Sequence, residues 1–416
     1  MIGLKEYRIA DLVVGKKSPQ PARILRFLWC RRGSALPVVL LVTLVLSLLG
    51  AGLLNLALSE RQGAATDLKI SQATYLAEAG INLALANLRR DPGWRGGLNN
   101  IQLTSWGHIN QVTVREKPLS LSLQADAEVG GIRRSIVADV SRPLTSYALM
   151  AGSGQGSLWE TPLMTIKGDI LYLGNLYITL QTLDGNVAAS GNLTNVFGTI
   201  KGNAVAGHNL INYGSIKGRA YYGNSYSGNP SGMGKEMVNL VFPRGVNEPE
   251  ASYKNGIQLT KEEYTLAELQ DIIDSGAPDD IQVLYRDGDL VIDRSDLSTY
   301  HGKGIIAASG TITLKTNLEA EPGSAWALVS GENFYVGDLW GLLGSFNIQG
   351  IIISGGYFST QFISYLNITG SIIARGVNSY LSLLNITYDP RFNAALSNQL
   401  NLGGWQVLSW RTAANY

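Results

Sequence analysis

The sequence predicts an α+β protein in which a long N-terminal helix and a small antiparallel sheet precede a mostly β domain of solenoid or β-helix type. Three observations predict this fold class. Residues 35–58 carry no charged side chain. The apolar residues that follow recur every three to four positions, the period of one helical face. From residue 165 onward, a motif containing glycine recurs about every 17 residues, which is typical of a solenoid coil.

Composition narrows the classes of function. The formal net charge is +1, so no basic surface indicates a nucleic-acid partner. Cys30 is the only cysteine, which excludes an intramolecular disulfide and a thiolate-rich metal site. His108, His208 and His301 are far apart and lie beside or near glycines, so we expect them in turns or on the surface. No cofactor is predicted.

Residues 35–58 are long and apolar enough to cross a bilayer of about 30 Å as a helix. A secretory signal has a shorter apolar region, and cleavage after this one would cut an amphipathic helix. The segment before it carries eight Lys or Arg residues against Glu6 and Asp11. By the positive-inside rule, we expect a single pass through the cytoplasmic membrane, with a cytoplasmic N-terminus and everything after residue 58 exported.

The helical pattern continues to about Arg90, where Asp91, a proline and a glycine end it. The basic leader ending in Gly33, the small residue Ser34, the apolar run and the sequence YLAEAG at residues 75–80 resemble the N-terminal region of type IV pilin-like proteins, most closely the PilX-type minor pilins. The resemblance covers roughly residues 31–94. It implies that a prepilin peptidase cuts between Gly33 and Ser34 and methylates the new terminus.

The resemblance also implies an assembly helix that packs against the helices of other pilins. Major pilins of this type carry Glu at the fifth mature position, where this chain has Val38. A carboxylate in lipid needs a partner to offset its desolvation, so its absence favours a minor, priming or tip-proximal subunit. We assign six residues to this helix surface: Val38, Leu41, Leu48, Tyr75, Glu78 and Gly80.

The remaining boundaries follow from changes of pattern. Residues 1–33 form the leader, and residues 34–92 form the helix with its transmembrane segment 35–58. Period-two alternation and a Gly130–Gly131 turn predict a pilin-like β-sheet over residues 93–145. Residues 146–395 form the solenoid-like domain, and residues 396–416 form a C-terminal cap or tail that contains Trp405 and Trp410.

Four segments of the solenoid align on glycines 168, 185, 202 and 218. Their apolar residues are expected to stack in one inward-facing row: Ile166, Leu183, Ile200 and Ile216. An insertion at about residues 226–287 interrupts these coils. Within it we predict a helix with Thr260 as N-cap, Glu263 completing a capping box and Gly276 ending it. Later glycine-separated strands predict further coils, which could close against the first set.

Chemistry-bearing motifs are weak in this domain. Asp287, Asp289 and Asp293 faintly resemble a calcium loop, but Gly is missing at the sixth position and the twelfth is not Glu. Sequons begin at Asn192, Asn367 and Asn385, which we interpret as turn residues. We therefore expect no catalytic site.

The leading functional hypothesis is a minor pilin-like subunit of a type IV pilus or pseudopilus that displays its solenoid at the cell surface for adhesion or assembly. Its expected partners are other pilins, the prepilin peptidase, the membrane and a surface glycan or other cell-surface ligand. The alternative is a membrane-anchored enzyme whose β-helix domain acts on polysaccharide. A third hypothesis is a tethered scaffold that polymerises through its solenoid ends.

Overall fold

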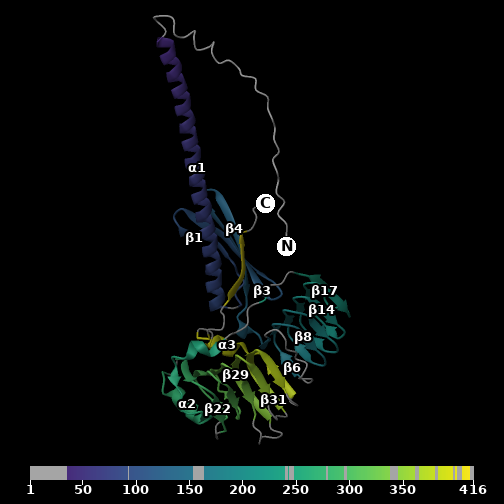
Figure 1. The fold of residues 1–416 in the computed structure, drawn as a ribbon. Helices are drawn as coiled ribbons and strands as arrows, with labels where there is room; N and C mark the ends of the chain where they lie inside the picture. The colour runs from purple at the N-terminus through teal and green to yellow at the C-terminus, as the bar shows by residue number, and fades with distance from the viewer. Residues whose placement is uncertain are drawn as a thin grey trace, which may run out of the picture. The chain divides into compact units, whose positions relative to one another are not determined.

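The computed structural model describes residues 35–91, 93–152, 164–238, 242, 248–277, 280–294, 298–337, 345–360, 365–379, 383–396, 399–400 and 405–412. The predicted processing residues Gly33 and Ser34 lie outside this set. The chain divides into two compact units, Met1–Lys69 and Ile70–Tyr416. Figure 1 shows the elements of both units in their order along the chain. The expected α+β class is confirmed.

Helix α1 (Ala35–Arg90) begins in the first unit and ends in the second. It is long and apolar enough to cross a membrane by length and composition. The two hydroxyl groups within residues 35–58 do not interrupt it, because they donate hydrogen bonds to the helix backbone. Thr43 Oγ1 donates to the Val39 carbonyl at 3.0 Å, and Ser47 Oγ donates to the Thr43 carbonyl at 2.7 Å.

The last five turns of α1 pack on an antiparallel sheet in the second unit. The strand order is β1–β2–β3–β4–β34, with the bounds β1 (Leu98–Thr104), β2 (Gly107–Glu116), β3 (Ser120–Val129), β4 (Ile132–Ser141) and β34 (Gln406–Thr412). The predicted turn at Gly130–Gly131 joins β3 to β4, and both glycines have positive φ. The helix buries one stripe on this sheet, which consists of Ala73, Leu76, Ala77, Gly80, Ile81, Ala84, Leu85 and Leu88.

The C-terminal segment expected to form a cap instead contributes to this sheet. β34 pairs antiparallel with β4. Trp405, just before it, is buried in the helix–sheet core, and its Nε1 donates to the Leu88 carbonyl at 2.9 Å. One of the open carbonyls of the last helical turn thereby receives a donor. The whole β-solenoid is consequently an insertion between two neighbouring strands of the sheet.

The solenoid has about ten turns, built from two sets of short strands that pair in parallel. The first set comprises β5 (Leu149–Ala151), β6 (Met164–Lys167), β7 (Ile170–Tyr172), β8 (Leu176–Ile178), β9 (Thr182–Asp184), β10 (Val187–Ala189), β11 (Leu193–Asn195), β12 (Thr199–Ile200), β13 (Ala204–Ala206), β14 (Asn209–Asn212), β15 (Ser215–Ile216), β16 (Ala220–Tyr222), β17 (Ser225–Gly228) and β18 (Lys235–Met237).

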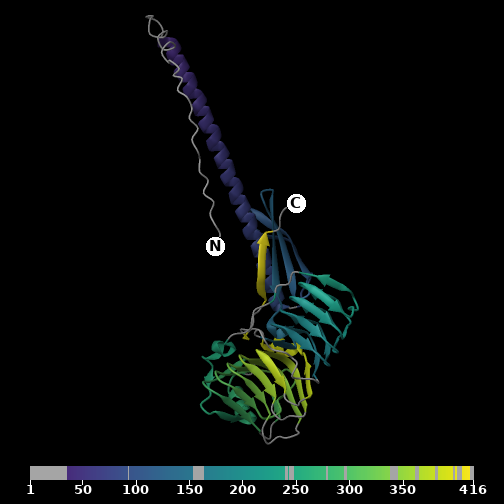
Figure 2. The same ribbon diagram turned by 45° about the vertical axis from the view of Figure 1, so that its right-hand side comes forward.

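The second set is drawn green to yellow in Figure 2, and its first three strands lie within residues 226–287, where an insertion was predicted, so strands occupy part of that range. It comprises β19 (Ile257–Gln258), β20 (Glu263–Thr265), β21 (Gln282–Arg286), β22 (Leu290–Asp293), β23 (Thr299–Tyr300), β24 (Lys303–Ala308), β25 (Ile312–Leu314), β26 (Glu319–Ala320), β27 (Ala325–Ser330), β28 (Phe334–Val336), β29 (Ser345–Ser354), β30 (Tyr357–Thr360), β31 (Tyr365–Ala374), β32 (Gly376–Ser379) and β33 (Leu383–Thr387).

The chain enters the solenoid in its middle and leaves it there. From β5 the first set proceeds through β7, β10, β13 and β16, each paired with the one before. The second set begins at the other end and returns, until β31 pairs with β5 and β33 pairs with β6. We call this junction the seam. The expectation that the later coils close against the first set is confirmed.

The predicted inward row is confirmed and is longer than expected. Ile166, Leu183, Ile200 and Ile216 pair in register, and each is at most 2 % exposed. The row continues across the seam through residues of the second set: Ile386, Ile368 and Ile348. One continuous apolar stack therefore joins the two sets.

The largest sheet is apolar on its outer face as well. Residues on this face form a second core, with helix α3 (Pro390–Leu396), the 3₁₀ helices η2 (Leu144–Ser146) and η4 (Pro249–Tyr253), and Phe242 packed against it. Parallel sheets generally need both faces covered. The chain supplies this cover from its connections rather than from a repeated helix.

Asparagines form hydrogen-bonded ladders between coils. Asn385 Nδ2 donates to Asn367 Oδ1 at 3.0 Å, and Asn367 Nδ2 donates to Asn347 Oδ1 at 3.1 Å. The interpretation of Asn367 and Asn385 as turn residues was wrong, because they lie inside β31 and β33. Asn192 lies in the connection between β10 and β11, and its Oδ1 accepts from the backbone N–H of Asn209 at 3.1 Å.

Helix α2 (Leu266–Asp274) begins later than predicted. The capping box is formed by Thr265 and Glu268, whereas Glu263 starts strand β20. The helix takes the place of a strand beside β23. Gln270, which is buried, accepts from the His301 N–H at 3.0 Å and donates to the His301 carbonyl at 3.2 Å. Its side-chain amide thus bonds both the backbone N–H and the backbone carbonyl of His301, as the peptide group of a neighbouring strand would.

Candidate assembly surface and ligand sites

Many of the exposed large apolar side chains of the described residues lie on the first half of α1. Val38, Leu41 and Leu48 are all exposed there, together with twelve further Leu or Val residues from position 36 to position 58. The first turn of the helix carries no acidic residue. Apolar surface of this extent, uninterrupted by charge, favours contact with lipid or with other apolar helices.

The YLAEAG segment lies in the second unit, where the helix meets the sheet. Tyr75 is 68 % exposed and Glu78 is half-buried. Gly80 is buried, and a Cβ placed there would lie 3.1 Å from Ala125 Cβ and 3.2 Å from Val112 Cγ2. Glycine therefore lets the helix backbone approach β2 and β3 closely. Of the six predicted assembly residues, Gly80 has a role inside the subunit.

Replacing Gly80 by Leu is expected to destabilise the helix–sheet contact by about 1–3 kcal/mol, because a side chain has no room between α1 and the sheet. Hydrogen exchange of the full chain in detergent would detect faster exchange in residues 70–90 and in β2 and β3. The matched control is Gly63→Leu, at a helical position with no neighbour within 4 Å. Equal exchange in both variants would contradict the packing argument.

Two of the predicted acidic residues, Asp287 and Asp289, accept hydrogen bonds within the solenoid. Asp289 Oδ1 accepts from the Thr311 N–H at 2.7 Å, and Asp287 Oδ1 accepts from Ser309 Oγ at 3.0 Å. These bonds link successive coils, as the asparagine ladders do. Among the described residues, no group of three or more His, Cys, Asp or Glu side chains is arranged to hold a metal ion.

Asp293 is instead paired with Glu263 from the neighbouring strand. A hydrogen bond that the protonated Glu263 carboxyl donates to Asp293 raises the pKa of Glu263 above its usual value, while the Arg294 backbone N–H, which donates to Asp293 Oδ1 at 2.8 Å, lowers the pKa of Asp293. Lys315 Nζ lies 3.8 Å from Glu263 Oε1 and offsets part of the negative charge. The pair lies at the surface and needs no metal ion to explain it.

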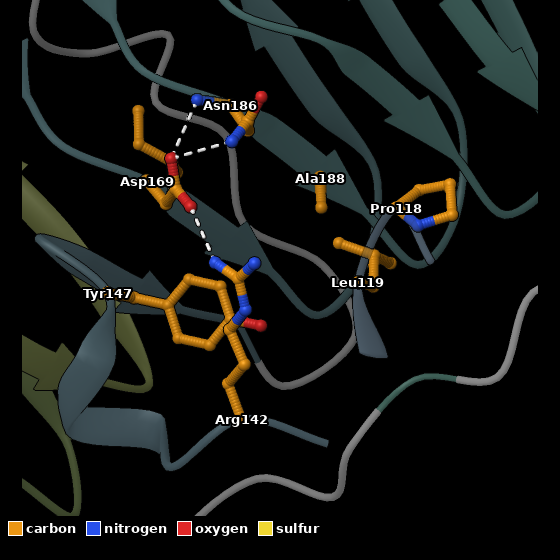
Figure 3. Close-up of a pocket in the computed structure, with 8 residues that line it drawn as sticks. Pro118, Leu119, Arg142, Tyr147, Asp169, Asn186 and Ala188 are labelled. Carbon is orange, nitrogen blue, oxygen red and sulfur yellow. Dashed lines mark hydrogen bonds and ion pairs between the residues drawn. The ribbon is translucent and has the colours of Figure 1, made fainter. Parts of the chain in front are cut away.

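One small cavity lies where the chain passes from the sheet into the solenoid (Figure 3). Arg142 Nη1 and Asp169 Oδ2 are 3.3 Å apart, and Asp169 Oδ1 accepts from both the backbone N–H and Nδ2 of Asn186. The Tyr147 hydroxyl is buried without a hydrogen-bond partner among the described residues, and burial raises its pKa to about 12. At about 10 Å³ the cavity has room for one water molecule and for no organic substrate.

Comparison with solved structures finds a likeness at a low TM-score, whereas the sequence comparisons find none. No protein-family model and no curated protein sequence matches the chain. Among solved structures, the chain is similar to the competence-associated pilin ComZ from Thermus thermophilus. The match has a TM-score of 0.36 and 14 % sequence identity, and it covers 83 % of this chain and 97 % of that chain.

Proposed function

We propose that this chain is a minor pilin-like subunit, inserted in the cytoplasmic membrane through α1 and assembled into a type IV pilus or pseudopilus. The proposal rests mainly on the difference between the two parts of helix α1. Residues 35–58 of α1 are apolar and exposed, whereas one face of the helix after Ile70 is buried on a five-stranded antiparallel sheet. The first part is thus available to lipid and to other subunits while the second holds the exported domain.

The proposed assembly contact is apolar. Residues 35–58 contain no charge, so helices of this kind can pack side by side after leaving the bilayer without burying an unpaired ion. Val38 cannot form the ion pair to a neighbour's terminal amine that a glutamate would form. This supports a minor, priming or tip-proximal place rather than the body of a filament.

The β-solenoid is the module that such a subunit would display at the cell surface. It leaves the sheet after β4 and returns at β34, so it is anchored to the pilin-like unit by two chain connections. This double attachment supports a role in adhesion or assembly, in which force passes between the solenoid and the helix.

The mature N-terminus tests the proposal. The protein isolated from its own cells is expected to begin at Ser34 and to carry an N-terminal methyl group, which mass spectrometry of the terminal peptide would detect. Gly33→Val should leave the leader attached, because a side chain at this position would block the peptidase. Gly15→Val, in the leader but away from the junction, is the control and should be processed normally. A mature terminus at any other residue would contradict the proposed processing.

A further inference from the structure

One face of the first solenoid set lacks charged residues. No Asp, Glu, Lys or Arg occurs in residues 170–183, 185–200, 202–216 or 220–234. These segments contain the four-stranded sheet β17–β14–β11–β8, labelled in part in Figure 1, and the turns that follow its strands. Charged residues are common on most protein surfaces, and here they are confined to the other side of each coil.

Large apolar side chains stand exposed on this uncharged face. Tyr177 is 41 % exposed, Leu180 61 %, Phe197 71 % and Tyr213 57 %. We call these four residues the apolar row. Leu180, Phe197 and Tyr213 lie at one register position on successive coils, because they stand two residues before Thr182, Thr199 and Ser215 respectively, which pair in register. Tyr177 lies on the same coil as Leu180. The row therefore follows the axis of the solenoid.

The row does not serve the fold of its own chain. Its side chains point away from the inward apolar stack, and exposed rings add little to stability when nothing covers them. A contiguous exposed apolar strip of this kind marks an interaction site. Its surroundings are neutral hydrogen-bonding groups, including Thr179 and Thr194, which are half-buried, and Ser227, which is exposed.

This chemistry indicates the ligand class. Rings and an aliphatic side chain offer flat apolar contact, and hydroxyl and amide groups offer adaptable hydrogen bonds, as in Tyr-, Ser- and Asn-rich recognition surfaces. The lack of charge removes attraction for polyanions, and it differs from the Arg-rich centres of typical protein interfaces. Neighbouring strands are about 4.7–4.9 Å apart, so the row presents a regular repeat to a ligand that is itself a repeating chain.

We propose that the apolar row binds a linear, uncharged polysaccharide, whose sugar rings stack along the solenoid axis on Phe197 and Tyr213, while Leu180 and Tyr177 extend the apolar contact on the preceding coil. Each ring face meets the C–H face of a sugar, and the neighbouring hydroxyl and amide groups bond its hydroxyls. This inference deepens the proposed function, since it rests on display of the solenoid at the cell surface and gives that display a ligand.

The test is calorimetric titration of the full chain in a non-glycosidic detergent. The probes are hexasaccharides of β-1,4-glucose, β-1,3-glucose, α-1,4-glucose and β-1,4-N-acetylglucosamine, with hexagalacturonate as the charged probe. At least one neutral probe should bind, and hexagalacturonate should bind about tenfold more weakly or not at all. Phe197→Ala should weaken binding about tenfold, as removal of a stacking ring does elsewhere.

Tyr365→Ala is the matched control, because this tyrosine is 43 % exposed in the second set, away from the row. It should leave binding unchanged. Absence of binding by every neutral probe, or equal affinity in Phe197→Ala and the unaltered chain, would overturn the inference. Self-association lost in Phe197→Ala without glycan binding would also overturn it, in favour of a second copy. If the mature protein begins at Ser34 but binds no glycan, the polysaccharide inference is wrong and the proposed function is retained.

Discussion

A disulfide placed across the seam is expected to form spontaneously and to raise the free energy of unfolding by about 5 kcal/mol. The variant is Lys167→Cys with Thr387→Cys, in a Cys30→Ser background that removes the natural cysteine. These residues are register partners in β6 and β33, and both are exposed. Adjacent strands place their Cα atoms within the range that a disulfide spans. The effect is large because the bond closes a loop of about 220 residues in the unfolded chain.

Mobility on non-reducing gels and denaturant titration would measure the two effects. Lys167→Cys with Asp184→Cys is the positive control, since these residues pair within the first set. Lys167→Cys with Lys217→Cys is the negative control, because β15 lies three strands from β6. A cross-link in the positive control without one between positions 167 and 387 would mean that the two sets do not meet at β6 and β33.

The seam also shows which parts of the fold could be predicted from the sequence and which could not. The inward row was predictable because its members repeat at a nearly constant spacing, and each neighbour in space is one coil away in the chain. The pairing of β33 with β6 joins residues more than 200 positions apart, and no local period encodes it. The same holds for β34, which was expected to form a cap and instead completes the sheet beside β4.

Local sequence motifs were easier to predict than the exact residues that form them. The insertion helix has the predicted type of capping box, but Thr265 and Glu268 form it in place of Thr260 and Glu263. Both Thr-x-x-Glu pairs fit the motif, and the choice depends on Glu263 being needed in β20, which pairs with β22. Likewise, asparagine is common in turns, and the sequence alone does not show that Asn367 and Asn385 bond to asparagines of adjacent coils.

The exposed row of the solenoid illustrates another limit. Phe197 and Tyr213 have the composition of core residues, and the sequence alone gives no sign that they point outward. In β11 alternate residues face the interior, and Leu193 and Asn195 are the buried ones. Phe197, which follows in the connection after this strand, is therefore left on the outside of the coil. A one-residue change of register would reverse these assignments.

The second prediction with a large expected effect concerns the inward apolar row. Ile200→Asp is expected to destabilise the solenoid by at least about 5 kcal/mol, because it removes a buried side chain and places a carboxylate where no donor faces it. Ile200 is fully buried between Leu183 and Ile216 in register. Such a loss is comparable to the whole stability of a typical domain. Lys201→Gln is the control: the next residue is exposed, and its ion pair with Asp184 at 2.8 Å should contribute no more than about 1 kcal/mol.

The place of the damage follows from the topology. Coils of a solenoid are stabilised mainly by their neighbours, so opening should spread from β12 to the near end of the first set, through β13, β15 and β16, rather than across the seam. Hydrogen exchange should therefore rise in residues 182–237 and stay low in β24, β27 and β29. Burial would raise the pKa of the new carboxyl group, so it is neutral at low pH, and the deficit should shrink as the pH falls. Uniform loss of protection in both sets would show instead that the seam joins them into one cooperative unit.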